Sequence, residues 1–128
     1  MIDHITFGVS DFAKSVAFYE AAFAPLGVTR LFTVPIEHTD GVNVTGFGDT
    51  RPWFWISEDR ATTGALHIAL QAQTRAQVDA FYAAAIAAGG IDHGAPGVRV
   101  HYHADYYGAF VLDPDGHNIE AVCHAPVG

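Results

Sequence analysis

The chain has 128 residues, enough for one compact domain with its own core, and half of them are hydrophobic. Aromatic residues make up 12% and charged residues 16%, which excludes a disordered chain because such chains are poor in aromatics and rich in charge. Fourteen acidic residues against six basic ones give a net charge of −8. Nucleic acid is therefore not an expected partner, since its binding needs a basic surface.

Two features bear on the cellular compartment. The longest nearly apolar stretch, at residues 80–91, falls short of the roughly 18 residues that a membrane-spanning helix needs, so no membrane association is expected. The N-terminus shows no basic region followed by an apolar run, and the single Cys123 cannot form an internal disulfide. The character of the N-terminus and the single cysteine both predict a cytoplasmic protein. The expected partner is a small-molecule substrate.

The chain opens with a pattern typical of a β-strand. Apolar side chains occupy alternate positions in residues 2–9, with His4 on the opposite face. A helix is expected next, capped by Ser10 or Asp11 and ended by Gly27, because glycine adopts the left-handed conformation that ends helices. Three extended runs follow, at residues 29–36, 42–47 and 53–57.

The second half follows the same order. A strand at residues 66–71 contains His67, and a helix begins after Thr74 and ends at the glycine pair 89–90. The longest irregular stretch is expected at residues 89–105. Further extended runs are predicted at residues 98–103, 106–112 and 118–123.

A tight turn joins the last two of these runs. Pro114 and Gly116 are typical of a β-turn, with Asp113 and Asp115 as turn-forming residues. His117, next to the turn, is expected to face solvent.

The two halves are internal repeats. His4 and Ile5 recur 63 residues later as His67 and Ile68, and the helix segment 17–19 recurs at the same offset. We therefore predict two βαβββ modules, residues 1–60 and 64–128, within a single α+β domain spanning 1–128. Modules of about 60 residues are marginal alone, so they should pack together.

The repeat predicts where three polar side chains point. If each helix covers the apolar face of its sheet, His4 and His67 point to the uncovered faces, and alternation places Glu120 beside His67. Two imidazoles and a carboxylate can bind a divalent metal and leave positions open for substrate. Iron, manganese, zinc and nickel all remain open as the metal. The alternative is that each is a polar group hydrogen-bonded within a half-buried sheet.

Other residues are candidates for substrate binding. Trp53 and Trp55 share one strand face, where they form either a flat apolar wall for a substrate or ordinary core packing. Arg99, beside the irregular stretch, is a candidate contact for an anionic group, because few other basic residues exist.

A polar and aromatic patch follows Arg99. His101 and His103 are two residues apart, so in an extended segment they share a face, and Tyr106 and Tyr107 follow closely. The patch is expected to be either a substrate-covering loop that donates protons or hydrogen bonds, or a solvated loop.

Three segments resemble the vicinal oxygen chelate superfamily, which includes glyoxalase I, extradiol dioxygenases and bleomycin-resistance proteins. They are residues 3–5, His67-Ile68, and the hairpin 110–120 that ends in Glu120. The resemblance implies an open, U-shaped, eight-stranded half-barrel with metal ligands at His4, His67 and Glu120. Glyoxalase I takes a fourth ligand from the last strand of its first module, and residues 53–57 contain no carboxylate or amide for that role.

The resemblance also implies a class of function. The first reading is a metal-dependent, glyoxalase-like lyase or isomerase that chelates adjacent oxygens of a small substrate and stabilises an enediolate or oxyanion, with Glu120 as ligand and catalytic residue. The alternatives are a ring-cleaving extradiol dioxygenase that uses ferrous iron, and a metal-free binding protein that sequesters a ligand. A homodimer is expected, with modules paired within or between chains. The sequence shows no glutathione site.

Overall fold

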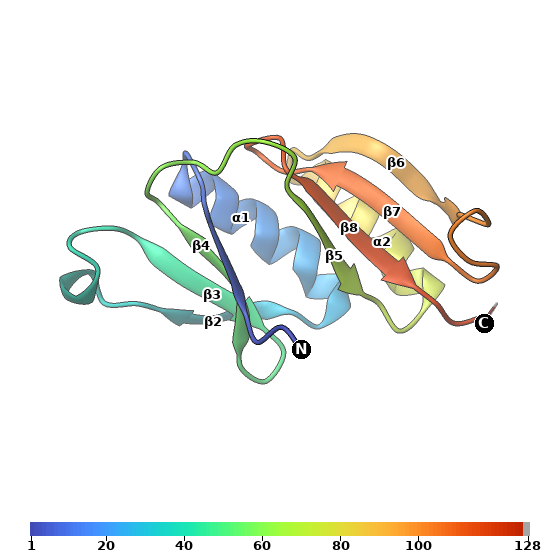
Figure 1. The fold of residues 1–128 in the computed structure, drawn as a ribbon, viewed down its shortest axis with the longest axis horizontal. Helices are drawn as coiled ribbons and strands as arrows, with labels where there is room; N and C mark the ends of the chain where they lie inside the picture. The colour runs from blue at the N-terminus through green and yellow to red at the C-terminus, as the bar shows by residue number, and fades with distance from the viewer. Residues whose placement is uncertain (127–128) are drawn as a thin grey trace.

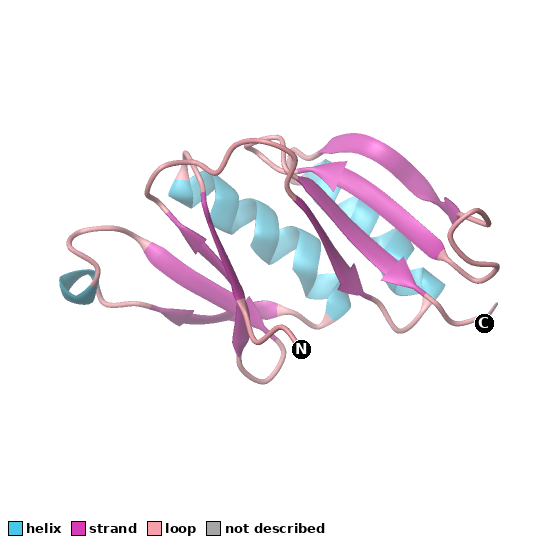
Figure 2. Cartoon of the chain, viewed as in Figure 1, coloured by secondary structure: helices cyan, strands magenta, loops and turns pink. Residues whose placement is uncertain are grey.

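Two four-stranded sheets lie side by side, and both helices lie behind them in the view of Figure 1. The computed structural model describes residues 1–126; residues 127–128, the last two of the expected second module, lie outside the described part. The faces turned away from the helices are open, as the secondary-structure view also shows (Figure 2). None of the helices in this part of the chain is long and apolar enough to cross a membrane.

The first sheet has the strand order β1-β4-β3-β2, in which β1 is parallel to β4 and the other pairs are antiparallel. Its elements are β1 (Ile5–Gly8), α1 (Phe12–Phe23), β2 (Thr29–Thr33), β3 (Val44–Gly48) and β4 (Pro52–Ser57).

The second sheet repeats this order as β5-β8-β7-β6, with β5 parallel to β8. Its elements are β5 (His67–Gln71), α2 (Arg75–Ala87), β6 (Ile91–Val98), β7 (Tyr107–Leu112) and β8 (Asn118–Cys123). The predicted α+β fold, an open half-barrel built from two βαβββ units, is confirmed.

Both helices begin and end where local chemistry favours it. The Asp11 carboxylate accepts a hydrogen bond from the backbone N–H of Lys14 at 3.1 Å, and the Thr74 hydroxyl does the same for Gln77 at 3.1 Å. Each bond satisfies one N–H that the first helical turn leaves free. Gly27 adopts φ 73° after the short 3-10 turn that follows α1, which lets the chain reverse into β2.

The core lies between the helices and the sheets. Tyr19 and Phe23 of α1 pack against Phe47 of β3 and Phe54 of β4, with the Phe23 and Phe54 ring centroids 4.9 Å apart. All four side chains are buried. Because α1 also contacts α2, one continuous apolar core joins the two halves.

The prediction of an irregular stretch at residues 89–105 was wrong for residues 91–98. Residues 91–98 form strand β6, and the expected strand at 98–103 is instead part of a turn-rich loop at 99–106. In the described part of the chain, β6 is an edge strand that pairs with β7 alone, and its register shifts between Asp92 and Gly97. Glycines and Pro96 break the apolar alternation there, so the strand depends on backbone pairing that periodicity does not reveal.

The turn before β8 is buried against the first half of the chain. The Asp113 carboxylate accepts hydrogen bonds from the Tyr19 hydroxyl at 2.5 Å and from the backbone N–H of Asp115 and His117. His117 is only 2% exposed and lies 2.7 Å from the Thr62 carbonyl oxygen, so its expected exposure to solvent was wrong. Asp113 and Asp115 do form the turn, as predicted. The turn thereby fastens the second sheet to α1.

Candidate functional site

The open face of the second sheet carries a histidine–carboxylate pair. His67 begins β5, Glu120 lies in the neighbouring strand β8, and His67 Nε2 is 2.8 Å from Glu120 Oε1. The Glu120 side chain is 1% exposed, whereas that of His67 is 50% exposed. A buried carboxylate needs such partners, because an unpaired buried charge is costly. The structure thus brings together two of the three predicted metal ligands.

Tyr106 completes the surroundings of this carboxylate. Its hydroxyl donates a hydrogen bond to Glu120 Oε2, so both carboxylate oxygens are engaged. Burial raises the pKa of the Tyr106 hydroxyl well above its usual range, and the hydrogen bond to Glu120 raises it further. Tyr106 therefore remains a hydrogen-bond donor throughout the physiological pH range.

A cavity of about 400 Å³ opens next to His67. The Phe110 ring lies near two basic side chains of the cavity. Its centroid is 5.9 Å from the centroid of the His67 ring and 5.4 Å from the Arg99 guanidinium carbon. This cavity, which we call the β5–β7 cavity, is lined by His67, His93, Gly94, Arg99, Tyr102, Phe110 and Asn118. Its volume suits a small ligand.

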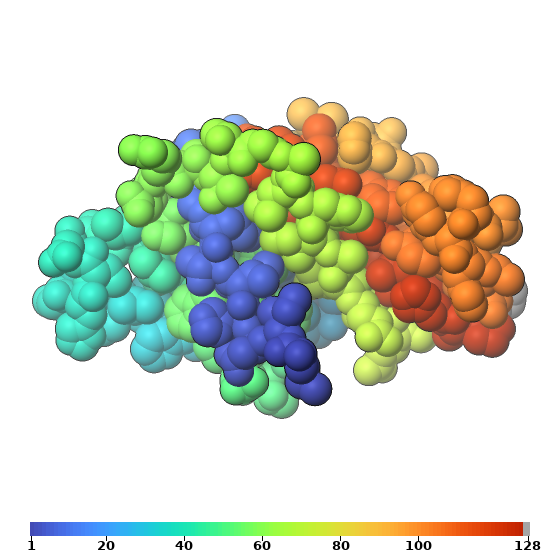
Figure 3. Space-filling view, in the orientation of Figure 1, coloured from blue at the N-terminus to red at the C-terminus, as the bar shows by residue number. Residues whose placement is uncertain are grey.

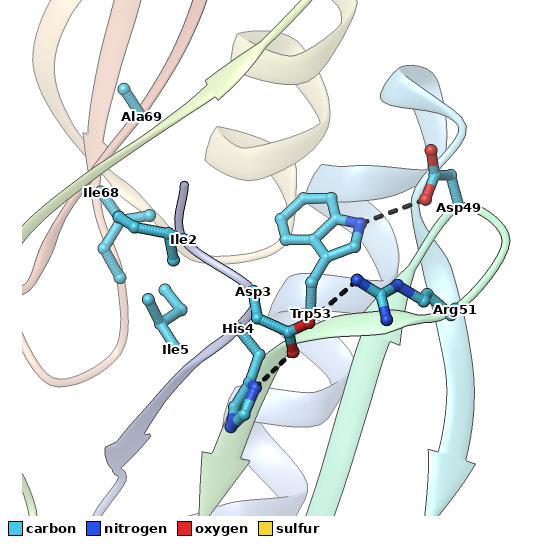
Figure 4. Close-up of a pocket in the computed structure, with 9 residues that line it drawn as sticks. All are labelled: Ile2, Asp3, His4, Ile5, Asp49, Arg51, Trp53, Ile68 and Ala69. Carbon is cyan, nitrogen blue, oxygen red and sulfur yellow. Dashed lines mark hydrogen bonds and ion pairs between the residues drawn. The ribbon is translucent and has the colours of Figure 1, made fainter.

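His4 lies in a different cavity, of about 430 Å³, at the seam between β1 and β5 (Figure 4). Its Nδ1 is 2.7 Å from the Asp3 carboxylate, which also accepts a hydrogen bond from Arg51 at 3.0 Å. The His4 hydrogen bond and then the Arg51 charge hold the pKa of Asp3 below its usual value. In the space-filling view, the N-terminal segment covers the front of the molecule beside β5 (Figure 3).

Within residues 1–126, no group of three or more His, Cys, Asp or Glu side chains is placed to hold a metal ion. His4 lines one cavity and His67 another, so a single chain does not assemble the three-residue site. The metal site at His4, His67 and Glu120 stays a prediction.

The two tryptophans have different neighbours on one face of β4. Trp53 lines the cavity that contains His4, and its indole N–H donates to the Asp49 carboxylate at 3.1 Å. The Trp55 ring packs instead on Phe32 of β2, with centroids 6.2 Å apart, and against the backbone of Gly46. Residues two apart in β4 thus contact different neighbours on the same face.

The residues after Arg99 divide between a loop and a strand: His101, His103 and Tyr106 lie in the loop 99–106, and Tyr107 begins β7. His101 and His103 are exposed in the loop 99–106 and do not share a strand face. His103 Nδ1 accepts a hydrogen bond from the backbone of Asp105 at 3.0 Å, which stabilises the turn. Tyr107 lies on the helix side of β7, where its hydroxyl donates to Asp79 of α2 at 2.6 Å. Alternation along the strand sends adjacent tyrosines to opposite faces.

The sequence reasoning singled out only His67 and Arg99 among the seven residues that line the β5–β7 cavity. Phe110 is the register partner of Glu120 in the β7–β8 pair, so the alternation of β7 could have placed it on the open face. His93 was missed because it lies in β6, a strand that the sequence did not reveal.

Comparison with known proteins gives a consistent picture. A family model described as the Glyoxalase/Bleomycin resistance protein/Dioxygenase superfamily matches residues 1–121. No curated protein matches the chain. Among solved structures, a glyoxalase/bleomycin resistance protein from Albidiferax ferrireducens T118 is 32% identical, with a TM-score of 0.72 over 94% of this chain and 96% of that one.

Two more distant structures share the fold. A mutant of the fosfomycin resistance protein FosX from Listeria monocytogenes, complexed with Mn(II) and 1S,2S-dihydroxypropylphosphonic acid, is 22% identical, with a TM-score of 0.69 over 95% of this chain and 88% of that one. Glyoxalase I from Zea mays is 20% identical, with a TM-score of 0.70 over 94% of this chain and 43% of that one.

Proposed function

Because the chain belongs to the glyoxalase/bleomycin resistance protein/dioxygenase superfamily, we propose that it is a metal-dependent enzyme with glyoxalase-like lyase or isomerase activity on a small substrate. The observation that carries this proposal is the contact between His67 and the buried Glu120 on the open face of the second sheet. The manganese bound by FosX, a protein of the same fold, also supports it.

The donor set fits a divalent metal. His67 Nε2 and Glu120 Oε1 are 2.8 Å apart. A metal ion bound at this position would be held by both of these atoms. Imidazole and carboxylate together suit zinc, manganese, iron and nickel. A metal bound there would supply Lewis acidity toward two adjacent oxygens of the substrate.

We further propose that His4 of a second copy supplies the third ligand in a homodimer. His4 is the repeat equivalent of His67, and its side chain is 56% exposed. Its own chain places it in a separate cavity, while the open faces of both sheets are uncovered. A two-fold arrangement would place the first sheet of one copy over the second sheet of the other and complete two equal sites.

The chain's own residues would then divide the work. Tyr106 holds Oε2 of Glu120, which orients Oε1 toward the metal position. In a lyase or isomerase step, Oε1 of Glu120 would leave its ligand position and accept the proton that the substrate releases. The Phe110 ring would exclude water from one side of the β5–β7 cavity.

The buried, unpaired Cys123 fits a reducing compartment, in keeping with a cytoplasmic location.

Elemental analysis of protein purified without chelator tests this function. We expect about one metal per chain in the native protein, a loss of most of it in His67→Ala and Glu120→Gln, and no loss in the control His38→Ala, an exposed histidine in the turn Ile36–His38. A native protein that binds none of the four candidate metals, even when they are added, would contradict the proposal.

Complementation tests the shared site. A His4→Ala chain keeps His67, and a His67→Ala chain keeps His4, so a hybrid dimer of the two contains one intact and one doubly defective site. Refolding the variants together should restore about a quarter of the native metal per chain, whereas neither variant alone binds metal. Sites built within one chain would show no restoration.

A metal-free binding protein is the second candidate. It is favoured by the separation of His4 from the other two ligands within one chain. Metal analysis separates it from the enzyme, and a site that accepts ferrous iron selectively would favour the dioxygenase alternative instead.

A further inference from the structure

The β5–β7 cavity differs in charge from the rest of the molecule. The chain has 14 acidic and six basic residues, yet the side chains that line this cavity include Arg99, His67 and His93 and no aspartate or glutamate. Glu120 lies beneath His67 with both carboxylate oxygens already engaged. The cavity is therefore lined by basic rather than acidic side chains, in a protein whose net charge is −8.

The neighbouring cavity at the β1–β5 seam shows the contrast. It has a similar volume, but there Asp3 lies against both His4 and Arg51, and Asp49 lies on the same wall. Its basic groups are matched by carboxylates of the chain itself. Within the described residues 1–126, the basic groups of the β5–β7 cavity form one ion pair, that of His67 with Glu120.

Arg99 is held in place by neutral groups. Its guanidinium donates to the carbonyl oxygens of Gly97 and Ala95, both at 2.8 Å, and lies over the Phe110 ring. These contacts use two of the five N–H donors and leave three free. Within residues 1–126 no carboxylate lies within ion-pair distance of it. A half-buried guanidinium without a countercharge favours binding of an anion.

The loop that contains Arg99 is also fixed. The backbone N–H of Arg99 donates to the Tyr106 carbonyl at 2.7 Å, and that of Tyr102 donates to the Arg99 carbonyl at 3.0 Å. Arg99 therefore reaches the cavity from a fixed position, and little conformational entropy is lost when it binds a ligand.

We propose that the β5–β7 cavity binds a small oxyanion, a carboxylate or a phosphate-type group, through Arg99. The identification of this ligand as the substrate rests on the proposed function, whereas the binding of an anion rests on the cavity alone. The anionic end would lie at Arg99 and the reacting oxygens at His67, with the Phe110 ring between them. The substrate is thus a short, negatively charged molecule.

Calorimetric titration of metal-free protein at low salt, with inorganic phosphate and with acetate as separate probes, tests the anion site. Arg99→Gln should weaken binding of the preferred probe by about tenfold or more, and Arg99→Lys by less, because lysine keeps the charge but not the planar fork. Arg60→Gln, an exposed arginine outside the cavity, should bind like the native protein. Equal affinity in native protein and Arg99→Gln, or no binding of either probe, would overturn the inference.

A second measurement uses only the native protein, in case Arg99→Gln disturbs β6. An arginine-selective dicarbonyl reagent should modify Arg99 several-fold more slowly when phosphate or acetate is present, while the rate at Arg60 stays unchanged, as read by peptide mass spectrometry. Unchanged modification of Arg99 would refute the site. Metal binding without anion protection refutes this inference alone, and anion protection without metal binding refutes the proposed function alone.

Discussion

At the residue scale, the environment of Glu120 is the most constrained feature of the molecule. The carboxylate is buried, and each of its oxygens contacts a side chain. Oε1 contacts His67 at the start of β5, and Oε2 accepts a hydrogen bond from Tyr106 in the loop before β7. Gly108 lies so close that an added Cβ would meet Glu120 Oε2 at 3.2 Å. Close packing around the carboxylate leaves it few alternative positions.

Tyr106→Phe removes the hydrogen bond to Glu120 Oε2 and leaves that oxygen unsatisfied. We expect the free energy of unfolding to fall by about 1 kcal/mol, at the low end of the range for a buried unsatisfied acceptor because Tyr106 is only half-buried. Urea denaturation followed by circular dichroism measures this change. Tyr102→Phe, which leaves the Glu120 carboxylate untouched, is the matched control, and equal unfolding midpoints for the two variants would contradict the argument.

The sequence predicted that His67 and Glu120 lie together, but it did not predict every residue around them. Strand alternation was enough to place His67 and Glu120 on one face, because both lie in regular strands of the repeat. It did not show that His4 would lie in another cavity, since that depends on how the two sheets pack rather than on either strand. The sequence singled out Arg99 but not Tyr102, which lines the cavity because of a turn whose geometry no periodicity encodes.

At the scale of elements, regular segments with a local signal were predictable and the edge strand was not. Helices α1 and α2 carry polar caps and apolar stripes, and β8 alternates polar and apolar residues over 118–121. Strand β6 has neither cue, because glycine and proline occupy its middle and its partner β7 holds it by backbone bonds. A pattern-based reading assigns such a segment to a loop.

The cap of α2 gives a prediction at this scale. Thr74→Ala should lower the free energy of unfolding by about 1 kcal/mol, because the backbone N–H of Gln77 loses its acceptor. Thr74→Ser keeps the hydroxyl and should stay within about 0.5 kcal/mol of the native protein. Thermal unfolding of the three proteins measures the difference, and a Thr74→Ala variant as stable as Thr74→Ser would exclude the cap as a source of stability.

At the scale of the whole molecule, the two repeats behave as one body because buried groups cross between them. Helices α1 and α2 share the core, and the Tyr19 hydroxyl of the first half donates to Asp113 of the second. Burial raises the pKa of Tyr19 well above its usual value, and the neighbouring Asp113 carboxylate raises it further. The hydroxyl therefore stays neutral in the folded protein at pH values that ionise it in the unfolded chain.

This difference predicts a loss of stability in alkali. The contribution of Tyr19 is fully present below pH of about 10, the usual tyrosine pKa, and falls as pH rises beyond it, because the unfolded chain releases the proton first. The phenylalanine of the Tyr19→Phe variant cannot ionise, so the free energy of unfolding of this variant should decline less steeply than that of the native protein between about pH 9.5 and 11. Denaturant titrations across this range measure both slopes, and parallel slopes would show that Tyr19 does not contribute.

One edge strand of each sheet has an irregular pairing register. Strand β2 shifts register between Arg30 and Phe32, and strand β6 does so between Asp92 and Gly97. Such shifts interrupt the row of backbone hydrogen-bond donors and acceptors with which a strand of another molecule would pair. The edges formed by β2 and β6 are therefore poor templates for strand pairing between copies, even though Phe32 of β2 is 51% exposed.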